Sequence, residues 1–153
     1  MTASAQEPAE GVDPVAGEHP VSSTIFALAR SHRALAASLL ADLGLFPGQE
    51  LILMRLWTRD GRSQKQLAEA LGLDHSTIAK SVRRLENAGL VTRTADPTDA
   101  RVRIVSLTPA GRALEEPTRA AWAELERAST RALTEHEQDL FVELARKVVG
   151  LLG

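Results

Sequence analysis

Cysteine is absent from the 153-residue sequence. This absence excludes disulfides, a thiol redox switch, a cysteine nucleophile and cysteine-ligated zinc. No apolar run approaches the roughly 20 residues that a membrane-spanning helix needs, so we expect no membrane association. The first twenty residues lack the basic start and the apolar stretch of a secretory signal, and a cytoplasmic location fits.

Signatures of enzymatic chemistry are missing as well. The four histidines, His19, His32, His75 and His136, are scattered and show no metal-ligand spacing. The sequence also has no glycine-rich phosphate loop. We therefore expect no enzyme activity, no catalytic residue, no metal and no cofactor. A metal-sensing regulator, whose ligands would meet only through folding, stays a minor alternative.

What the sequence does contain is an ordinary globular mixture with an uneven distribution of charge. Apolar residues make up 44% and charged residues 25%, which is typical of one globular domain. The net charge is −2, yet residues 59–112 carry ten bases and six acids. Residues 1–20 carry four acids and no base, and residues 113–153 carry five bases and eight acids. A basic middle between acidic flanks favours binding of a polyanion on one face.

The amino-terminal half predicts a tail and two helices. Residues 1–20 lack a periodic apolar face and predict a flexible acidic tail. Residues 21–43 predict a long helix, capped at its start by one of three hydroxyl residues: Ser22, Ser23 or Thr24. Pro47 suits the first turn of the next helix, because a first turn does not need its missing N–H. That helix has a wide apolar stripe of Leu51, Met54 and Trp57 with Ile52 and Leu56 beside them, which predicts a central, buried helix.

Two short helices then follow closely. Ser63 and Gln66 form a predicted capping box at the start of the first, which ends near Gly72. Asp74 caps the second, which covers residues 75–88 and ends at Gly89. Two short helices joined by a tight glycine-containing turn indicate a helix-turn-helix unit.

A protruding loop is predicted after this unit. Leu90–Arg93 and Arg101–Leu107 read as strands on either side of a loop that contains Asp96 and Pro97. Thr108 caps a further helix over residues 109–130, which Pro117 should kink or interrupt near residues 113–116. A final helix, residues 134–152, opens with a second capping box formed by Thr134 and Glu137.

The second short helix has two chemically distinct faces. Ile78, Val82 and Leu85 fall on one side at helical spacing and should face the core. The other sides carry hydroxyl and cationic side chains, with a histidine at the start: His75, Ser76, Thr77, Lys80, Arg83 and Arg84. Such a face suits the major groove, where Lys or Arg donates to guanine O6 and N7. A merely solvated helix face is the alternative, because helix-turn-helix units also occur without DNA.

Basic residues also surround the predicted wing. Arg93, Arg101 and Arg103 flank or follow the loop, and an arginine on a narrow protrusion can enter the minor groove. Asp99 lies two residues before Arg101 and can orient its guanidinium group. Read without DNA, the two would form a surface ion pair that contributes little to stability.

Three stretches resemble the multiple-antibiotic-resistance regulator (MarR) family: GLFPGQELILMRLW, SQKQLAEALGLDHSTIAKSVRRLENAGLVTR and DPTDARVRIVSLTPAGR. The Asp-Pro-x-Asp-x-Arg wing followed by Leu-Thr-x-x-Gly is the most specific part. The resemblance covers about residues 21–152. It implies a winged-helix dimer, mainly α with a small β-wing and about six helices, that represses transcription and is released by a small anionic or phenolic effector.

The resemblance also assigns roles to individual residues. Recognition positions fall on His75, Ser76, Thr77 and Lys80, backbone-contact positions fall on Ser63, Gln64, Lys65 and Arg84, and the wing pair falls on Asp99 and Arg101. Two positions depart from the family pattern. His75 stands where the family often has arginine, and Val102 stands where many relatives have a small residue.

We therefore expect a homodimer that binds double-stranded DNA. The winged helix covers about residues 47–108, and helices over about 21–43 and 109–152 would pair in the dimer, because their apolar stripes would otherwise stay exposed. A helical bundle closed within a monomer is the alternative. His32 and Trp57 are candidate effector-pocket residues, although core or interface positions would explain both. The alternative function is a winged-helix protein-interaction module without a DNA target.

Overall fold

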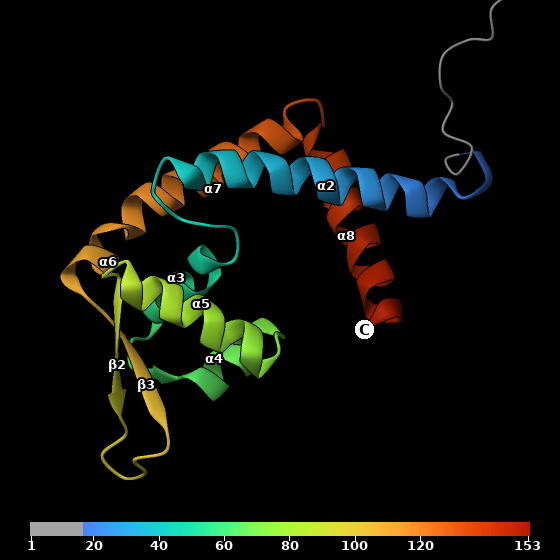
Figure 1. Cartoon of the computed structure of the whole chain (residues 1–153). Coiled ribbons are helices and arrows are strands. Elements are labelled where there is room, and N and C mark those ends of the chain that lie inside the picture. The colour runs from blue at the N-terminus through green and yellow to red at the C-terminus, as the bar shows by residue number, and fades with distance from the viewer. Residues whose placement is uncertain (1–16) are drawn as a thin grey trace, which may run out of the picture.

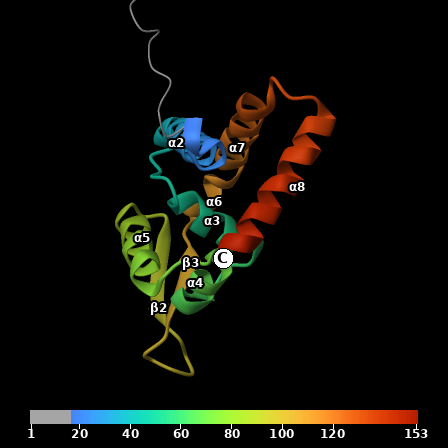
Figure 2. The same ribbon diagram turned by 90° about the vertical axis from the view of Figure 1, so that its right-hand side faces the viewer.

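Three long helices form an arm beside a smaller lobe in the computed structural model, which describes residues 17–153. In the arm, α2 (Pro20–Ala41) and α7 (Glu115–Thr130) run side by side (Figures 1 and 2). The third arm helix, α8 (Glu135–Leu152), leaves the end of α7 and descends separately from the lobe (Figure 1). The first sixteen residues of the expected acidic tail lie outside the described part of the chain.

The lobe begins with α3 (Gln49–Thr58) and contains the predicted helix-turn-helix unit, α4 (Gln64–Leu71) and α5 (His75–Asn87). The capping box at the start of α4 is confirmed. Ser63 Oγ accepts from the Gln66 backbone N–H at 3.1 Å, and Gln66 Oε1 accepts from the Ser63 N–H at 2.9 Å. These bonds satisfy backbone donors that the first turn of a helix leaves free.

A small antiparallel sheet closes the lobe. Its strands are β1 (Arg62–Ser63), β2 (Val91–Ala95) and β3 (Arg103–Leu107), in the order β1-β3-β2. The wing strands β2 and β3 begin later than expected, and the link between them projects beyond the lobe (Figure 1). The sequence did not predict β1, because two residues carry too little pattern to indicate a strand.

The core lies inside the lobe, where α3, α4 and α5 pack against the sheet. Its most deeply buried side chains are Ile52, Leu53, Leu56, Leu67, Ile78, Val82, Leu85, Val91 and Val105. The predicted inner face of α5 is therefore confirmed. The predicted apolar stripe of α3 was partly right: Ile52 and Leu56 are buried as expected, and Leu53 is buried as well. Leu51, Met54 and Trp57 are only half-buried.

Two predicted helix starts were wrong. α2 begins at Pro20, whose fixed φ suits a first helical turn, and no side chain caps it. α3 begins at Gln49 and not at Pro47, because Gly48 adopts a φ of +97°, a left-handed conformation that glycine tolerates. Gln49 Oε1 then accepts a hydrogen bond from the Phe46 N–H, and Glu50 Oε2 accepts one from the Gly48 N–H.

Residues 108–114 connect the lobe to the arm, and we call this segment with the lobe residues bonded to it the joint. Thr108 caps α6 (Pro109–Ala113), and Leu114 separates α6 from α7, so the interruption predicted near Pro117 is confirmed. Proline lacks the N–H that would continue the helical bonding through this point. The predicted capping box of Thr134 and Glu137 at the start of α8 is also present. Within residues 17–153, no helix is long and apolar enough to cross a membrane.

Candidate nucleic-acid interface

The two faces of α5 differ as sharply in the structure as in the sequence. Ile78, Val82 and Leu85 are fully buried against the lobe, which fixes the orientation of the helix. The candidate recognition residues all lie exposed on its remaining sides: His75, Ser76, Thr77, Lys80, Arg83 and Arg84. Burial of one face therefore presents hydroxyl, imidazole and cationic groups together to the outside.

Asp74 organises the first turn of α5. Its Oδ1 accepts from the Thr77 backbone N–H at 2.9 Å and from Ser76 Oγ at 2.5 Å, and its Oδ2 accepts from Thr77 Oγ1 at 2.5 Å. The Ser76 hydroxyl, then the Thr77 hydroxyl and backbone N–H, hold the pKa of Asp74 well below its ordinary value. The carboxyl group is therefore ionised at neutral pH and accepts hydrogen bonds only.

The cations of this face have no ionic partner within the described residues. Lys80, Arg83 and Arg84 form no ion pair there, and neither does Arg103 on β3, whereas the arm ion pairs link residues one helical turn apart. Since a phosphate is the partner that such exposed cations bind in nucleic-acid complexes, this face can neutralise a polyanion.

The start of α4 contributes a second group of candidates. Ser63 is half-buried, and its hydroxyl oxygen is already used as a helix cap. Lys65 is exposed and lies 4.0 Å from Glu69, a loose pair of one helical turn. Gln64 is half-buried, and its Nε2 is buried without a hydrogen-bond partner in the described part of the chain. Of these three side chains, Lys65 is the one that extends freely into solvent.

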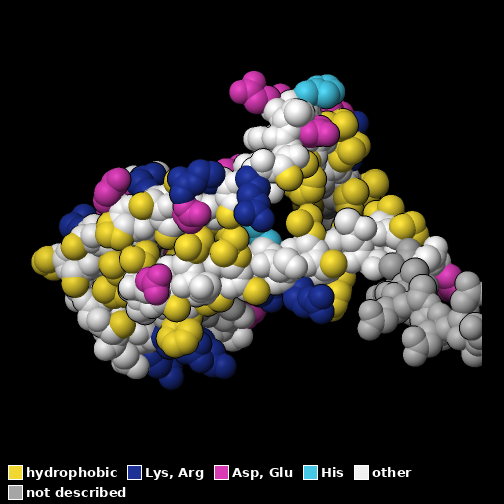
Figure 3. Space-filling model, turned by 90° about the horizontal axis from the view of Figure 1, so that it is seen from above, with side chains coloured by type: hydrophobic (Ala, Val, Ile, Leu, Met, Phe, Trp, Pro, Cys, Tyr) yellow, Lys and Arg dark blue, Asp and Glu magenta, His cyan; other side chains and the backbone are white. Residues whose placement is uncertain are grey.

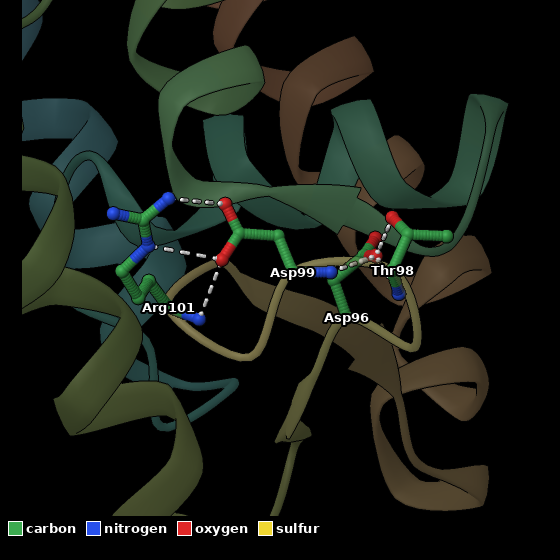
Figure 4. Close-up of polar contacts among 4 residues, drawn as sticks. All are labelled: Asp96, Thr98, Asp99 and Arg101. Atoms are coloured by element: carbon green, nitrogen blue, oxygen red, sulfur yellow. Dashed lines mark hydrogen bonds and ion pairs between the residues drawn. The ribbon is translucent and has the colours of Figure 1, made fainter.

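At the wing tip, Asp99 bonds to the side chain and the backbone of Arg101, and Thr98 bonds to Asp96 (Figure 4). Asp96 Oδ1 accepts from the Thr98 hydroxyl and from the backbone N–H groups of Thr98 and Asp99, which folds the loop and lowers the pKa of Asp96. Asp99 then accepts from Arg101 three times: from its backbone N–H at 3.0 Å, from Nε at 3.2 Å and from Nη2 at 3.4 Å. The Arg101 side chain nevertheless stays 92% exposed, so it is oriented without being covered.

Arg93 is placed differently from the other wing arginines. Its Nε and Nη2 donate to Glu86 Oε2 at 2.8 and 2.5 Å, and both side chains are about two-thirds buried. This ion pair links the last turn of α5 to β2. The sequence did not single out Glu86, because no short motif relates two residues on a helix and on the following strand.

Asp60 connects three parts of the chain at the joint. Its Oδ1 accepts from the backbone N–H groups of Gly61 and Leu107, each at 2.9 Å, and its Oδ2 accepts from Arg112 Nη2 at 2.5 Å. Asp60 therefore joins the end of α3 to β3 and α6. The sequence showed only a helix end here, because the bonded residues are 47 and 52 positions away.

The joint is also closely packed. Trp57 Nε1 donates to the Gly111 carbonyl oxygen at 3.0 Å, and a Cβ atom at position 111 would overlap the Leu90 carbonyl oxygen. Thr108 Oγ1 donates to the Gly89 carbonyl oxygen at 2.6 Å, and the Thr108 N–H donates to the Leu90 carbonyl oxygen at 3.1 Å. The start of α6 is thus fixed to the end of α5 and to the first residues of the wing.

The two candidate effector-pocket residues do not meet in an evident cavity. His32 is exposed on α2, and Trp57 is half-buried with its indole N–H bonded to Gly111. Surface depressions lie on α8 and beside β1, and neither is lined by His32 or Trp57. No group of three or more potential metal-ligating His, Asp or Glu side chains occurs among residues 17–153.

A helix-turn-helix with an exposed cationic face, followed by a wing that holds out an arginine, defines a winged-helix protein of the transcription-regulator class. The sequence profile of the MarR family matches residues 45–102. The chain belongs to the MarR family of transcriptional regulators.

Individual relatives extend this similarity. The HTH-type transcriptional regulator TtmR of Methylorubrum extorquens is 34% identical over 103 residues, which cover 67% of this chain and 53% of TtmR. The transcriptional regulator HosA of Escherichia coli O111:H- is 32% identical over 102 residues, which cover 67% of this chain and 76% of HosA. The chain spans about half the length of TtmR.

Solved structures share the whole arrangement. A probable transcriptional regulator from Pseudomonas aeruginosa has a TM-score of 0.78 and 34% identity, covering 86% of this chain and 98% of that chain. The PcaV transcriptional regulator from Streptomyces coelicolor, crystallised in complex with its natural ligand, has a TM-score of 0.80 and 28% identity, covering 94% and 99%. The arm and the lobe therefore both have counterparts in known regulators.

Proposed function

We propose that this chain is a homodimeric DNA-binding repressor that a small-molecule effector releases from its operator. The carrying observation is the outer face of α5. Its inner side chains are fully buried, so the hydroxyl groups and unpaired cations opposite them are held in a fixed, exposed array. An exposed helix with this chemistry fits the major groove, and Arg101 on the projecting wing fits the adjacent minor groove.

Each candidate residue has a proposed role in this complex. His75, Ser76, Thr77, Lys80 and Arg83 face the bases or the nearby phosphates. Ser63, Gln64, Lys65 and Arg84 contact the phosphate backbone. Asp99 orients Arg101 in the wing, and Arg93 and Arg103 add positive charge beside it. The partial burial of Gln64 and Arg93 indicates smaller direct contributions from these two side chains.

Homodimer formation is supported by the arm. Large apolar side chains on α2 and α8 lie in solvent: Val21, Ile25, Phe26, Leu28, Leu140, Phe141, Val142, Leu144, Val149, Leu151 and Leu152. Figure 3 shows hydrophobic side chains gathered in the angle between these two helices. Exposure of so many large apolar side chains to water is unfavourable in a monomer, and a second copy related by a twofold axis would cover them.

Release by an effector is supported by the similarity to PcaV, which was crystallised with its natural ligand. A small anionic or phenolic compound is the proposed class for this chain. His32 and Trp57 are the proposed lining residues, because His32 lies on α2 of the arm and Trp57 lies on α3 of the lobe. The pocket would form between these two parts in the dimer.

The test is a salt titration of duplex DNA binding by the full chain, with molecular mass measured in the same buffers. DNA for the titration is selected from a random duplex library. A DNA-binding dimer has twice the chain mass and an affinity that falls steeply with salt, because neutralised phosphates release counterions. A chain that binds no duplex at low salt would overturn the proposal and favour the protein-interaction module.

A further inference from the structure

The hydroxyl groups of Ser76 and Thr77 have their protons committed to one acceptor. Ser76 Oγ lies 2.5 Å from Asp74 Oδ1, and Thr77 Oγ1 lies 2.5 Å from Asp74 Oδ2. An ionised carboxylate has no proton to give, so both hydroxyl groups must be the donors in these bonds. Each hydroxyl group has a single proton, and in this arrangement each has none left for a further partner.

This commitment fixes what the two side chains can offer to DNA. A hydroxyl oxygen whose proton is donated still has a free lone pair and can accept a hydrogen bond. In the major groove, the base groups that donate are the N4 amino group of cytosine and the N6 amino group of adenine. Guanine O6 and N7 and thymine O4 are acceptors, and they would face a second acceptor without a proton between them.

Lys80 has the opposite polarity on the same helix. Its ammonium group only donates, and it lies one helical turn after Ser76 on the exposed side of α5. The recognition face therefore presents hydrogen-bond acceptors in its first turn and a donor in its second. A face with this order distinguishes the two strands of a base step, because each base pair has its amino group on one side only.

We infer that Ser76 and Thr77 are specificity-determining residues that select adenine or cytosine, and reject guanine or thymine, at the bases that they face. The inference rests on the proposed DNA-binding function and names the bases that its recognition helix prefers. Asp74 sets this preference without touching DNA, since it determines the direction of both hydroxyl groups. It is a positioning residue.

The test is selection of duplex DNA from a random library by the chain and by four variants. For the wild type, we expect positions restricted to adenine or cytosine on one strand. Thr77→Val and Ser76→Ala each remove one hydroxyl group and should each relax one such position by about 2- to 10-fold, as for a single hydrogen bond. Thr130→Val, which removes a hydroxyl group from α7, should leave the selected sequence unchanged.

The decisive variant is Asp74→Asn, which keeps the shape and the capping ability of the residue. Asparagine Oδ1 can still accept from the Thr77 N–H, and its amide N–H would then donate to Thr77 Oγ1. The Thr77 hydroxyl group would be free to donate outward. The base preference that depends on Thr77 should therefore change from adenine or cytosine to guanine or thymine, with thermal melting as a check of folding.

Each outcome has a defined meaning. Loss of a position in Thr77→Val together with its reversal in Asp74→Asn supports the inference. Selected sequences that are the same for wild type, Ser76→Ala and Thr77→Val would overturn it, while salt-dependent duplex binding would leave the proposed function standing. A chain that binds no duplex DNA would overturn both. Guanine or thymine at the positions lost in these variants would contradict the assigned direction of the hydroxyl groups.

Discussion

Glu86 on α5 and Arg93 on β2 form an ion pair in which two guanidinium nitrogens share one carboxylate oxygen, at 2.5 and 2.8 Å. Hydrogen bonding from Arg93 lowers the pKa of Glu86. The pair ties the recognition helix to the wing, and it compensates one of the positive charges that would otherwise face DNA. The charge of Arg93 is therefore less available to phosphate than the charge of Arg103, which forms no ion pair within the described residues.

Glu86→Gln should consequently strengthen DNA binding. The variant removes a negative charge beside the interface and leaves Arg93 free to contact phosphate. We expect the slope of log K against log salt to become steeper by up to about 0.9 per protomer, or nearly 2 for a dimer. Glu124→Gln, which removes a carboxylate from α7, is the matched control. An unchanged slope in Glu86→Gln would show that Arg93 does not contact the phosphates of the DNA backbone.

Lys80→Ala should weaken specific binding by about 1–3 kcal/mol per half-site if Lys80 reads a base. The residue is exposed on α5 and has no ion-pair partner among the described residues. Lys65→Ala is the comparison, because Lys65 is proposed to contact phosphate and should lose similar affinity on any DNA. The measurement is competition between the selected duplex and random duplex. Equal losses for Lys80→Ala on both DNAs would assign Lys80 to the backbone instead.

Arg101→Ala should reduce affinity and flatten the salt dependence, by about 0.9 in slope for each contact and nearly 2 for a symmetric dimer. Its side chain is 92% exposed and packs against no core surface, so the melting temperature should stay unchanged. Asp99→Ala should give a weaker version of the same defect, since Arg101 keeps its charge and loses its orienting partner. A large fall in melting temperature for Arg101→Ala would identify the residue as structural.

Glu50 should give the protein an unusual stability profile with pH. Burial raises its pKa above the ordinary value of 4.5, against hydrogen bonds that lower it. At pH values between the unfolded-state pKa of 4.5 and the raised folded-state pKa, Glu50 binds more protons in the folded state than in the unfolded state. The contribution of Glu50 to the free energy of unfolding therefore falls as pH rises above about 4.5. Glu50→Gln should remove this dependence and should be more stable than wild type at neutral pH.

Glu137→Gln is the control of opposite sign for this experiment. Hydrogen bonds from Thr134, first from its backbone N–H and then from its hydroxyl group, lower the pKa of Glu137. Its contribution is present above pH 4.5 and is lost as pH falls below that value. Denaturant unfolding from pH 3 to 8 measures the free energy of unfolding of Glu50→Gln, Glu137→Gln and wild type. If the free energy of unfolding of Glu50→Gln changed with pH in parallel with that of wild type, the raised pKa of Glu50 would be contradicted.

Gly111→Ala should destabilise the lobe by about 1–3 kcal/mol, the usual cost of overpacking, because its Cβ atom would overlap the Leu90 carbonyl oxygen. The same shift would disturb the bond between Trp57 and the Gly111 carbonyl group. Ala110→Ser adds an atom at the exposed neighbouring position and is the control. Denaturant unfolding followed by circular dichroism measures the stability of both variants, and tryptophan fluorescence, to which Trp57 and Trp122 both contribute, follows the surroundings of the indole. Wild-type stability in Gly111→Ala would mean that α6 can move away from the wing.

Local features of the structure were predictable from the sequence, and long-range features were not. The capping boxes at Ser63 and Thr134 were predicted correctly, because their partners lie three residues away. The inner face of α5 was also correct, since three well-spaced apolar residues define it. In α3 residues 51–54 are all apolar, so no single face stands out, and the sequence placed Met54 inward where Leu53 is buried.

The interface shows the same division. Exposure of Lys80 and Arg101 followed from periodicity and from turn chemistry. The partners of Asp60 could not be predicted, because they lie 47 and 52 positions away. The partner of Arg93 is only seven residues away, but no short motif relates a helix residue to one on the following strand. The direction of the Ser76 and Thr77 hydroxyl groups required side-chain geometry, although Asp74 itself was recognised as a cap.

Because α6 is bonded to the lobe, the chain changes direction toward the arm only after α6 has ended. Thr108, Gly111 and Arg112 are all bonded to the lobe, so α6 turns with the wing as one rigid unit. The helical direction changes at Leu114, where α6 ends and α7 begins and where the Leu114 side chain packs against the core of the lobe. An α7 of 16 residues is about 24 Å long, so a rotation of about 10° at Leu114 displaces its far end by about 4 Å. In a dimer joined through its arms, small angular changes at this residue would alter the separation of the two recognition helices by several ångströms.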